Sequence, residues 1–505
     1  MPSAPPTERV PGAIVTAAGP SPNARRTLIL AACLMATFMA AVESTIVATA
    51  MPTIVASLGG FDLFSWVFAI YLLTQAISIP IYGRLADIHG RKAVFYGGAG
   101  LFLTGSVLCG FAPSMLWLVV FRALQGFGAG GVQPIAMTIC GDIYTPSERA
   151  RVQGLISSVF GVAAVVGPSL GAWLVEHAAW QVVFWINLPV GAVAITMIAV
   201  FLRENVQTRR HRVDVAGSVL MMIAGAALML ALVQYSDLTP NVERTALAVG
   251  AIGLGALVWH ERRTTEPMLA LELLHDRVIL IGGLGGGLAG AVMMGVSAFL
   301  PAYVQGAMER TPTTAGLVLG AMSVTWALSS IIGGRLMVRT TYRLAAILGA
   351  LALIAGCGLL VLLTPGRGVA WATAGSLVIG VGMGFCNTAF IVSVQAAVAW
   401  NKRGAATSWC LFLRYVGQAI GAASFGAVLN ETVAHRMPAA RHLMDRLLDP
   451  AARQGLTPEV RTQLSDVVAA GLHNAYFLGC AIAVGVLVLV VFLPARLSPA
   501  QQRLQ

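Results

Sequence analysis

Apolar side chains fill long, nearly unbroken stretches of the chain from residue 27 onward, and short polar segments separate these stretches. Most stretches reach the roughly 20 residues that a helix needs to cross the hydrocarbon core of a bilayer. We expect helices, because an isolated strand in lipid would leave its backbone hydrogen-bonding groups unpaired. The pattern therefore predicts fourteen membrane-spanning helices, of which the eighth is the shortest: 27–51, 63–83, 93–112, 115–140, 153–175, 181–202, 215–234, 245–260, 279–304, 314–334, 343–364, 369–393, 405–428 and 474–494.

The composition agrees with a protein that lies mostly in lipid. Of the 505 residues, 57% are hydrophobic and 10% are charged, whereas about 25% of residues are charged in a typical soluble domain. So few charges would not cover a soluble surface, and the chain is too apolar to remain disordered. The composition therefore predicts an all-α, polytopic membrane protein.

The net charge of +11 would suggest a nucleic-acid partner if the basic residues formed one patch. Instead, 22 of the 32 lysines and arginines fall in tails and loops on the side of the N-terminus. Such residues accumulate in cytoplasmic loops. We therefore expect both termini in the cytoplasm, a multi-pass protein of the cytoplasmic (inner) membrane, and no nucleic-acid partner.

Two segments outside the spans are long enough to matter. Residues 1–26 are rich in Pro, Ala and Ser, and we expect a disordered cytoplasmic tail without a cleavable signal peptide. The outer loop 429–473 carries apolar residues at helical spacing, which predicts amphipathic helices. These helices would either shape a substrate entrance or simply cap the protein.

Several kinds of chemistry have no signature in the sequence. The seven cysteines lie within or at the edge of spans, so we expect no disulfide. No His/Cys cluster has the spacing of a metal site, and no P-loop is present for ATP. We expect no metal and no cofactor.

Glu43 stands apart, because it alone among the 21 acidic residues lies well inside a span. A charge at mid-membrane costs about 2.5–3.5 kcal/mol on insertion scales. Arg122, in the fourth span, is expected at a similar depth on the outer side of the membrane centre, so the two side chains can pair. A proton-binding carboxylate and a permanent ion pair both fit this placement. We favour the proton site, because intramembrane carboxylates usually mark ion or proton paths.

Arg414 lies near the middle of the thirteenth span and has no deep acidic partner in the sequence. It could attract an anionic group of a substrate, organise backbone carbonyls, or pair with a loop carboxylate through water. Small residues around it equally indicate close helix packing.

The segment 83–92 (GRLADIHGRK) follows the second span and is expected to form a short loop. Its glycines favour a tight turn, and Asp87 could dock on the positive end of a helix. Arg91 could pair with Asp142 or Glu148 of the next inner loop. The composition is equally typical of a solvated turn with inside-positive charges.

The fifth span contains the segment 167–172 (GPSLGA). Pro168 removes one backbone hydrogen bond, and Gly167 and Gly171 allow another helix to approach closely. A bending helix and a merely close-packed helix both explain this segment.

Five segments, in order along the chain, resemble motifs of the major facilitator superfamily. The segment 83–92 is similar to its signature loop, 122–126 (RALQG) to the fourth-span motif associated with proton transfer, and 167–172 to the fifth-span antiporter motif. Segments 43–52 (ESTIVATAMP) and 180–191 (WQVVFWINLPVG) resemble motifs of the fourteen-span drug:proton antiporters of EmrB/QacA type. This chain has Glu43 where that family usually has aspartate.

The resemblance implies the major facilitator fold, with two six-helix bundles and two extra inserted helices. The expected divisions are an N-terminal bundle 27–202, a two-helix insertion 203–277, a C-terminal bundle 278–495 with loop 429–473, and a cytoplasmic tail 496–505. It also implies proton coupling by Glu43 and Arg122. The residues to which it assigns gating are Gly83, Asp87, Gly90, Arg91, Lys92 and Asp142.

The function implied is not an enzymatic one but proton-coupled multidrug efflux of amphipathic, often cationic compounds by alternating access. Its partners would be small amphipathic substrates, protons, the lipid bilayer and, as a further candidate, a periplasmic adaptor. The same fold would also suit a dedicated exporter of a lipid or metabolite, or a transport-dead sensor, against which Glu43 and Arg122 argue. Polar and aromatic candidates for lining a substrate cavity are Gln75, Gln133, Trp326, Asn387, Trp409, Arg414 and Gln418.

Overall fold

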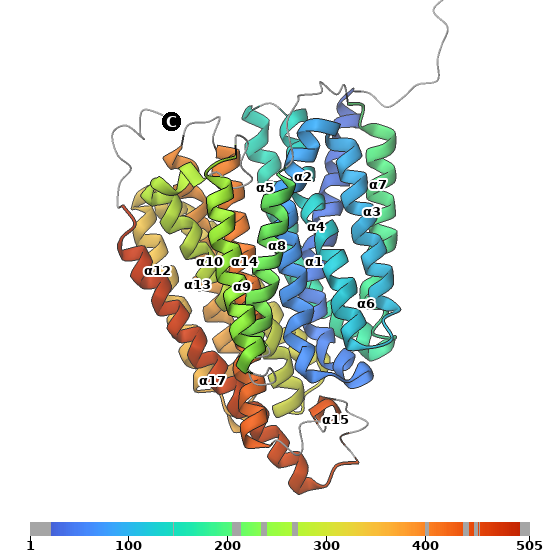
Figure 1. The fold of residues 1–505 in the computed structure, drawn as a ribbon, viewed down its shortest axis with the longest axis vertical. Helices are drawn as coiled ribbons and strands as arrows, with labels where there is room; N and C mark the ends of the chain where they lie inside the picture. The colour runs from blue at the N-terminus through green and yellow to red at the C-terminus, as the bar shows by residue number, and fades with distance from the viewer. Residues whose placement is uncertain are drawn as a thin grey trace, which may run out of the picture.

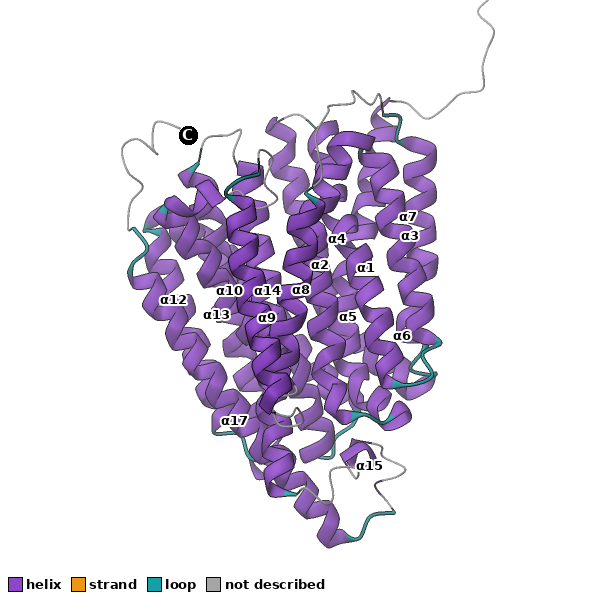
Figure 2. Cartoon of the chain, viewed as in Figure 1, coloured by secondary structure: helices purple, strands orange, loops and turns teal. Residues whose placement is uncertain are grey.

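The computed structural model describes residues 22–144, 146–204, 214–233, 240–264, 271–398, 403–437, 444–448, 453 and 455–494. Within these residues the chain is helical, and no β-strand occurs among them (Figure 2). The all-helical class that the apolar pattern predicts is therefore confirmed. The expected tail 496–505 lies outside the described residues.

The long helices follow one another with short connections. Their bounds are α1 Pro22–Leu58, α2 Phe64–His89, α3 Arg91–Gly110, α4 Met115–Ile143, α5 Pro146–His177, α6 Val182–Trp185, α7 Asn187–Phe201, α8 Val215–Val233, α9 Pro240–Glu261, α10 Arg277–Ala302, α11 Pro312–Arg339, α12 Tyr342–Val361, α13 Gly368–Ala397, α14 Arg403–Arg436, α15 Met444–Leu448 and α17 Pro458–Val491. Short 3-10 turns are Phe61–Leu63, Leu271–His275 and Pro365–Arg367, and Tyr303–Ala307 forms a π-helical turn.

Thirteen helical segments of the described chain are long and apolar enough to cross a membrane. A further helix, α5, has 32 residues, covers the predicted fifth span and packs against α1 and α11. Each predicted span therefore corresponds to a helical segment. The eighth, predicted as the shortest, is the 22-residue helix α9.

The expectation of a loop at 83–92 is wrong for most of that segment. Helix α2 continues through Gly83 to His89, because nothing before Gly90 interrupts it. A Cβ added at Gly83 would meet no neighbouring atom, so no steric requirement for glycine exists there. The turn is made by Gly90, whose φ of 88° is one that glycine adopts readily and other residues do not.

The sixth span is interrupted where the sequence places a proline. Pro189 has no backbone N–H to donate to the carbonyl of Trp185. Helix α6 ends at Trp185, and α7 begins two residues later at Asn187. The break places the side chain of Asn187 at the start of a new helix, inside the bundle, where it is 3% exposed.

Helices occur in the range 429–473, but they are mostly continuations of the flanking spans. Helix α14 extends to Arg436, and α17 starts at Pro458, well before the predicted span. Thr457 accepts a hydrogen bond from the backbone of Val460 and Pro458 occupies the first turn, a combination that favours helix initiation. At the other end of the chain, α1 begins at Pro22, inside the range expected for the tail.

The helices form two halves that lie side by side (Figure 1). One half contains α1–α7, the other contains α10–α17, and the inserted helices α8 and α9 lie in front of the line where the halves meet. We call the contact between the halves the seam. At the seam α2 packs against α14 and α5 against α11, while α8 touches both α2 and α14.

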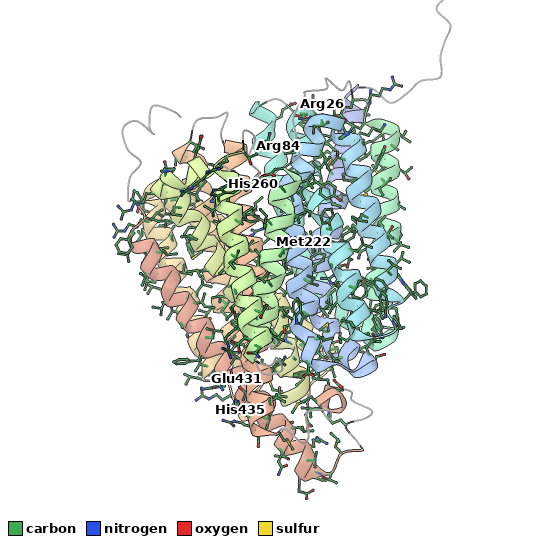
Figure 3. All side chains as sticks on the ribbon, viewed as in Figure 1. Arg26, Arg84, Met222, His260, Glu431 and His435 are labelled. Atoms are coloured by element: carbon green, nitrogen blue, oxygen red, sulfur yellow. The ribbon has the colours of Figure 1, made fainter. Side chains whose placement is uncertain are left out.

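The two ends of the helix array can be told apart by their residues. Arg26 and Arg84 lie at the end where α1 begins, which we call the N-terminal face (Figure 3). Glu431 and His435, near the end of α14, lie toward the other end, which we call the opposite face.

Near the opposite face the halves meet through aromatic rings and small residues. The ring of Phe64 on α2 lies 5.0 Å from that of Phe299 on α10. A Cβ at Gly426 of α14 would collide with Ser65 of α2. This close packing leaves little room between the halves there.

Candidate functional site

The deepest charges of the chain form one buried ion pair between α1 and α4. The guanidinium of Arg122 donates to the first carboxylate oxygen of Glu43, and the side chains are 1% and 0% exposed. The second carboxylate oxygen accepts a hydrogen bond of 2.6 Å from the side-chain amide of Asn187 on α7. Both oxygens of the carboxylate are therefore bound.

Arg122 has further partners that do not depend on the carboxylate. Its Nη1 donates to the side-chain oxygen of Gln125 at 2.8 Å, and its Nε donates to the backbone carbonyl of Val67 at 3.2 Å. The ring of Tyr71 lies 3.9 Å from the guanidinium carbon, within the range of a cation–π interaction. Loss of the carboxylate charge would leave the arginine solvated by these groups.

Ser106 of α3 closes the network around the ion pair. Its hydroxyl accepts hydrogen bonds from Gln125 at 3.1 Å and Asn187 at 3.0 Å, and donates to the carbonyl of Phe184 at 2.7 Å. Six helices therefore contribute hydrogen-bonding groups to one buried cluster: α1, α2, α3, α4, α6 and α7.

Small residues bring these helices together. A Cβ at Gly105 of α3 would meet the backbone of Gln125 on α4, and one at Gly126 would collide with Tyr71 and Thr74 of α2. The glycine of the RALQG segment therefore allows α4 to approach α2 at the level of the ion pair.

The fifth-span segment packs directly on the helix that carries Glu43. A Cβ at Gly167 would collide with the hydroxyl of Thr45, and one at Gly171 would approach that of Thr49. On its other side, the carbonyl of Pro168 faces Gly316 of α11. Gly167, Pro168 and Gly171 thus bring α5 close to α1 and α11.

At the N-terminal face, the residues expected to gate the transporter hold α2, α3, α4 and α7 together. The Nε of Arg91 donates to Asp142 at 3.0 Å, and its Nη1 donates to the carbonyl of Ala86 at 3.1 Å. The side chain of Lys92 donates to the carbonyls of Ala199 and Leu202 at 2.7 and 2.8 Å, at the end of α7.

Glu204 completes this set by accepting the backbone N–H groups of Arg91 and Lys92 at 2.8 and 2.9 Å. It thereby satisfies the free donors at the start of α3. The ion pair of Arg91 and Asp142 lies within one half and does not cross the seam. The side chain of Asp87 is outside the described part of the structure.

The residues proposed to line a substrate cavity lie on both sides of the seam. Gln133 of α4 accepts a hydrogen bond of 2.9 Å from the hydroxyl of Tyr415 on α14, which joins the two halves. Arg414 donates to Asn387 of α13 at 3.2 Å. The structure therefore brings together two pairs, each containing a predicted residue.

The remaining predicted cavity residues are more dispersed. Gln75 on α2 and Gln418 on α14 are buried, and Trp409, also on α14, has no hydrogen-bond partner for its indole N–H. Trp326 on α11 is half-buried. Within the described residues, no hydrogen bond links these four side chains to the pairs above.

Hydrogen bonds across the seam are concentrated toward the opposite face. They join five residue pairs of the described chain: Thr49–Gln305, Phe61–Asp445, Asp62–Asn430, Glu176–Thr313 and Gln133–Tyr415. Of these pairs, only Gln133–Tyr415 lies near the middle of the helix array. Hydrogen bonds thus tie the halves together from the middle of the array to the end where α1 finishes.

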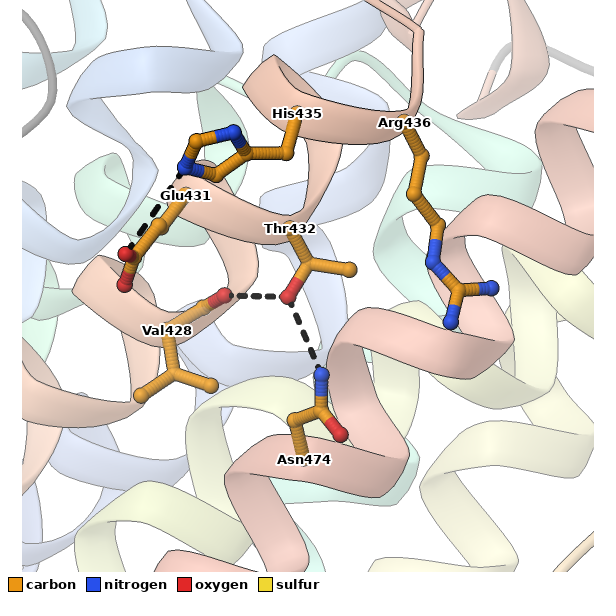
Figure 4. Close-up of a pocket in the computed structure, with 6 residues that line it drawn as sticks. All are labelled: Val428, Glu431, Thr432, His435, Arg436 and Asn474. Atoms are coloured by element: carbon orange, nitrogen blue, oxygen red, sulfur yellow. Dashed lines mark hydrogen bonds and ion pairs between the residues drawn. The ribbon is translucent and has the colours of Figure 1, made fainter.

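A shallow pocket of about 360 Å³ opens near the opposite face (Figure 4). The residues that line it come from α14 and α17: Val428, Glu431, Thr432, His435, Arg436 and Asn474. Thr432 accepts a hydrogen bond of 3.3 Å from Asn474. None of the predicted site residues lines this pocket.

Several residues of the central network were not among the sequence candidates: Asn187, Gln125, Ser106, Tyr71 and Glu204. Asn187 and Gln125 lie within segments that resemble family motifs, and an amide inside an apolar span is a usable signal. Ser106 and Tyr71 carry no such signal, because serine and tyrosine are common in membrane helices.

Long apolar helices packed around a buried polar cluster define a multi-pass helical membrane protein. The sequence profile of the Major Facilitator Superfamily matches residues 33–422. The chain belongs to this family, so it is a membrane transporter of small molecules.

Proteins of similar sequence are also named as transporters. "Multidrug transporter protein MdtP" of Bacillus subtilis is 35% identical over 413 residues, which cover 81% of this chain and 76% of that protein. "Efflux pump FUS6" of Gibberella moniliformis is 30% identical over 482 residues, which cover 89% of this chain and 84% of that protein.

Solved structures show the same fold. A bacterial homolog of the human lysosomal transporter Spinster, crystallised in an inward-facing and unoccupied conformation, superposes with a TM-score of 0.65 at 18% identity. The alignment covers 94% of this chain and 99% of that one. A mutant of the nucleoside transporter NupG gives a TM-score of 0.60 at 11% identity, covering 92% and 99% of the two chains.

Proposed function

We propose that the protein is a proton-coupled multidrug antiporter of the fourteen-span type, which exports amphipathic, often cationic compounds across the cytoplasmic membrane. Both termini lie in the cytoplasm in this proposal, because most basic residues gather on that side. Relatives named as a multidrug transporter and as efflux pumps support the direction and breadth of transport.

The observation that carries the proposal is the fully buried carboxylate of Glu43. An ionised carboxylate in this position needs Arg122 and Asn187, and both are in place. Proton binding would neutralise the carboxylate and weaken its bond to Arg122. The arginine would keep Gln125, Val67 and the ring of Tyr71, so both protonation states have partners for every charge.

The same contacts supply a route from the proton to the seam. Val67 and Tyr71 belong to α2, and α2 packs against α14 of the other half. A change in the bond between Glu43 and Arg122 therefore acts on a helix that moves when the halves rock. One charge crossing 100 mV is worth about 2.3 kcal/mol, which is ample to bias such a movement.

The distribution of contacts across the seam supports alternating access. The halves are joined at the middle and toward the opposite face, which is the outer face in the proposed orientation. We assign this arrangement to the state that faces the cytoplasm. Arg91 and Asp142 would then position the turn between α2 and α3 for closure of the inner side in the other state.

A reconstituted assay tests the proton role. Full-length protein in liposomes with an imposed pH gradient should accumulate a fluorescent amphipathic dye such as rhodamine 123 and dissipate the gradient in return. Glu43→Gln should abolish gradient-driven accumulation while downhill dye exchange persists. Glu431→Gln, which alters a side chain that is 49% exposed, is the matched control and should transport normally. Full gradient-driven activity in Glu43→Gln would disprove the proposal.

A further inference from the structure

A second cation inside a span, the half-buried Arg414, lies on the other side of the seam and lacks the carboxylate partner that Arg122 has. The guanidinium of Arg414 donates from Nη1 to the side-chain oxygen of Asn387 at 3.2 Å. No carboxylate within the described residues lies at ion-pair distance from it. Its Nε is buried without any hydrogen-bond partner.

Arg414 lies next to the seam. The adjacent residue, Tyr415, crosses the seam to bind Gln133. A Cβ at Gly290 of α10 would lie 3.2 Å from the Cγ atoms of both Arg414 and Gln418, so the glycine leaves room for the arginine stem. Arg414 reaches from α14 to Asn387 on α13.

The balance of charges inside the spans points to an incomplete site. The sequence puts three charges well within the predicted spans, and two of these, Glu43 and Arg122, neutralise each other. Arg414 therefore leaves the middle of the protein with an excess positive charge. Arg414 is half-buried, with a buried Nε, so it pays part of the cost of removing a cation from water, and an anion that binds two of its N–H groups offsets that cost.

We infer that Arg414 and Asn387 form a recognition point for the anionic oxygen group of an amphipathic organic substrate, such as an aromatic carboxylate. The Nε–H and Nη N–H groups of Arg414 would donate to the anion, and the side-chain N–H₂ of Asn387 would supply a further donor. The inference rests on the proposed transport function and extends the range of that site beyond cationic compounds. An interior-negative membrane potential favours export of such an anion.

Two dyes with the same xanthene ring system separate charge from shape. Fluorescein is anionic near neutral pH, whereas rhodamine 123 is cationic. Binding of each dye is measured by fluorescence anisotropy, with full-length protein in phosphatidylcholine nanodiscs so that no anionic lipid competes. No pH gradient is present, so the result does not depend on proton coupling.

Arg414→Gln should weaken fluorescein binding by about tenfold or more, because hydrogen bonds between charged groups are strong. Arg414→Lys keeps the charge but not the two-pronged geometry, and it should lie between the wild type and Arg414→Gln. Asn387→Ala should weaken fluorescein several-fold. Arg436→Gln, also on α14 but in the pocket near the opposite face, is the matched control and should leave fluorescein affinity unchanged.

Thermal unfolding of each variant shows whether it is folded, and the intermediate Arg414→Lys keeps the test informative if Arg414→Gln is unstable. Fluorescein affinity within twofold of the wild type in folded Arg414→Gln, or no fluorescein binding by the wild type, would overturn the inference. A different result would separate the two proposals. If the variants change fluorescein binding as expected but the protein shows no proton-driven transport in liposomes, the anion site is supported and the proposed antiport is disproved.

Discussion

Asn187 donates a hydrogen bond of 2.6 Å to Glu43 from the first residue of α7. The bond exists because Pro189 breaks the sixth span and α7 restarts at Asn187, inside the bundle. The same amide donates to Ser106 of α3. One side chain thus connects the candidate proton site to two helices that do not belong to the ion pair.

Replacement of Asn187 by alanine should impair coupling more than folding. The second carboxylate oxygen of Glu43 would lose its only described donor, at a cost of about 1–3 kcal/mol for a buried charged group. We expect gradient-driven dye transport to fall by about tenfold or more, measured in liposomes at equal protein content. Asn241→Ala, at an exposed position of α9, should match the wild type. Normal transport by Asn187→Ala would show that the bond has no part in coupling.

Shortening the side chain at position 43 should break one of the two contacts that its carboxylate makes. Glu43→Asp moves the carboxylate back by about 1.5 Å, one carbon–carbon bond, so it cannot keep both Arg122 and Asn187 at bonding distance. Transport should drop about tenfold, and the double variant Glu43→Asp/Asn187→Gln should recover part of it because the longer amide reaches further. A double variant no better than Glu43→Asp alone would contradict this geometry.

The spans were predictable because burial in lipid imposes a simple rule on the sequence. Long apolar runs gave all the long helices, including the inserted α8 and α9. Glu43 and Arg122 were predictable as candidates for a pair, because charges are scarce in the spans and these two lie at similar depth. That they do pair depends on the packing of α1 against α4, which only the structure shows. The hydropathy pattern does not show where a helix ends, because a helix can continue through polar residues beyond the apolar span. Helix α2 therefore runs on to His89.

The rest of the site depends on contacts between neighbouring helices, which no single segment of the sequence encodes. Ser106 and Tyr71 act at the site only because Gly105 and Gly126 let α3, α4 and α2 approach one another. The bond between Gln133 and Tyr415 joins residues that are 282 positions apart and depends on how the halves dock. Such contacts follow from tertiary packing, which a hydrophobic pattern does not specify.

The crossing of α10 and α14 should be intolerant of even one added methyl group. A Cβ at Gly417 would collide with the backbone of Gly287, and overpacking of this kind costs about 1–3 kcal/mol. Gly417→Ala should lower the unfolding temperature of the purified protein by several degrees. Gly358→Ala is the matched control, since a Cβ there meets no atom, and it should be neutral or slightly stabilising. Equal unfolding temperatures for the two variants would argue against this packing.

We predict that the hydrogen bonds between Glu176 and Thr313 break in each transport cycle. The backbone N–H of Thr313 donates to the Glu176 carboxylate at 2.9 Å, which ties α5 to α11 across the seam near the opposite face. Cysteines at both positions should form an oxidised cross-link that blocks transport, and a reductant should restore it. Ser57 and Trp180 are also in contact near this face, at 3.1 Å, but both lie in one half. A cysteine pair at those two positions should therefore leave transport intact when oxidised. Transport that continues at the full rate through a complete 176–313 cross-link would mean that the halves do not separate at this face.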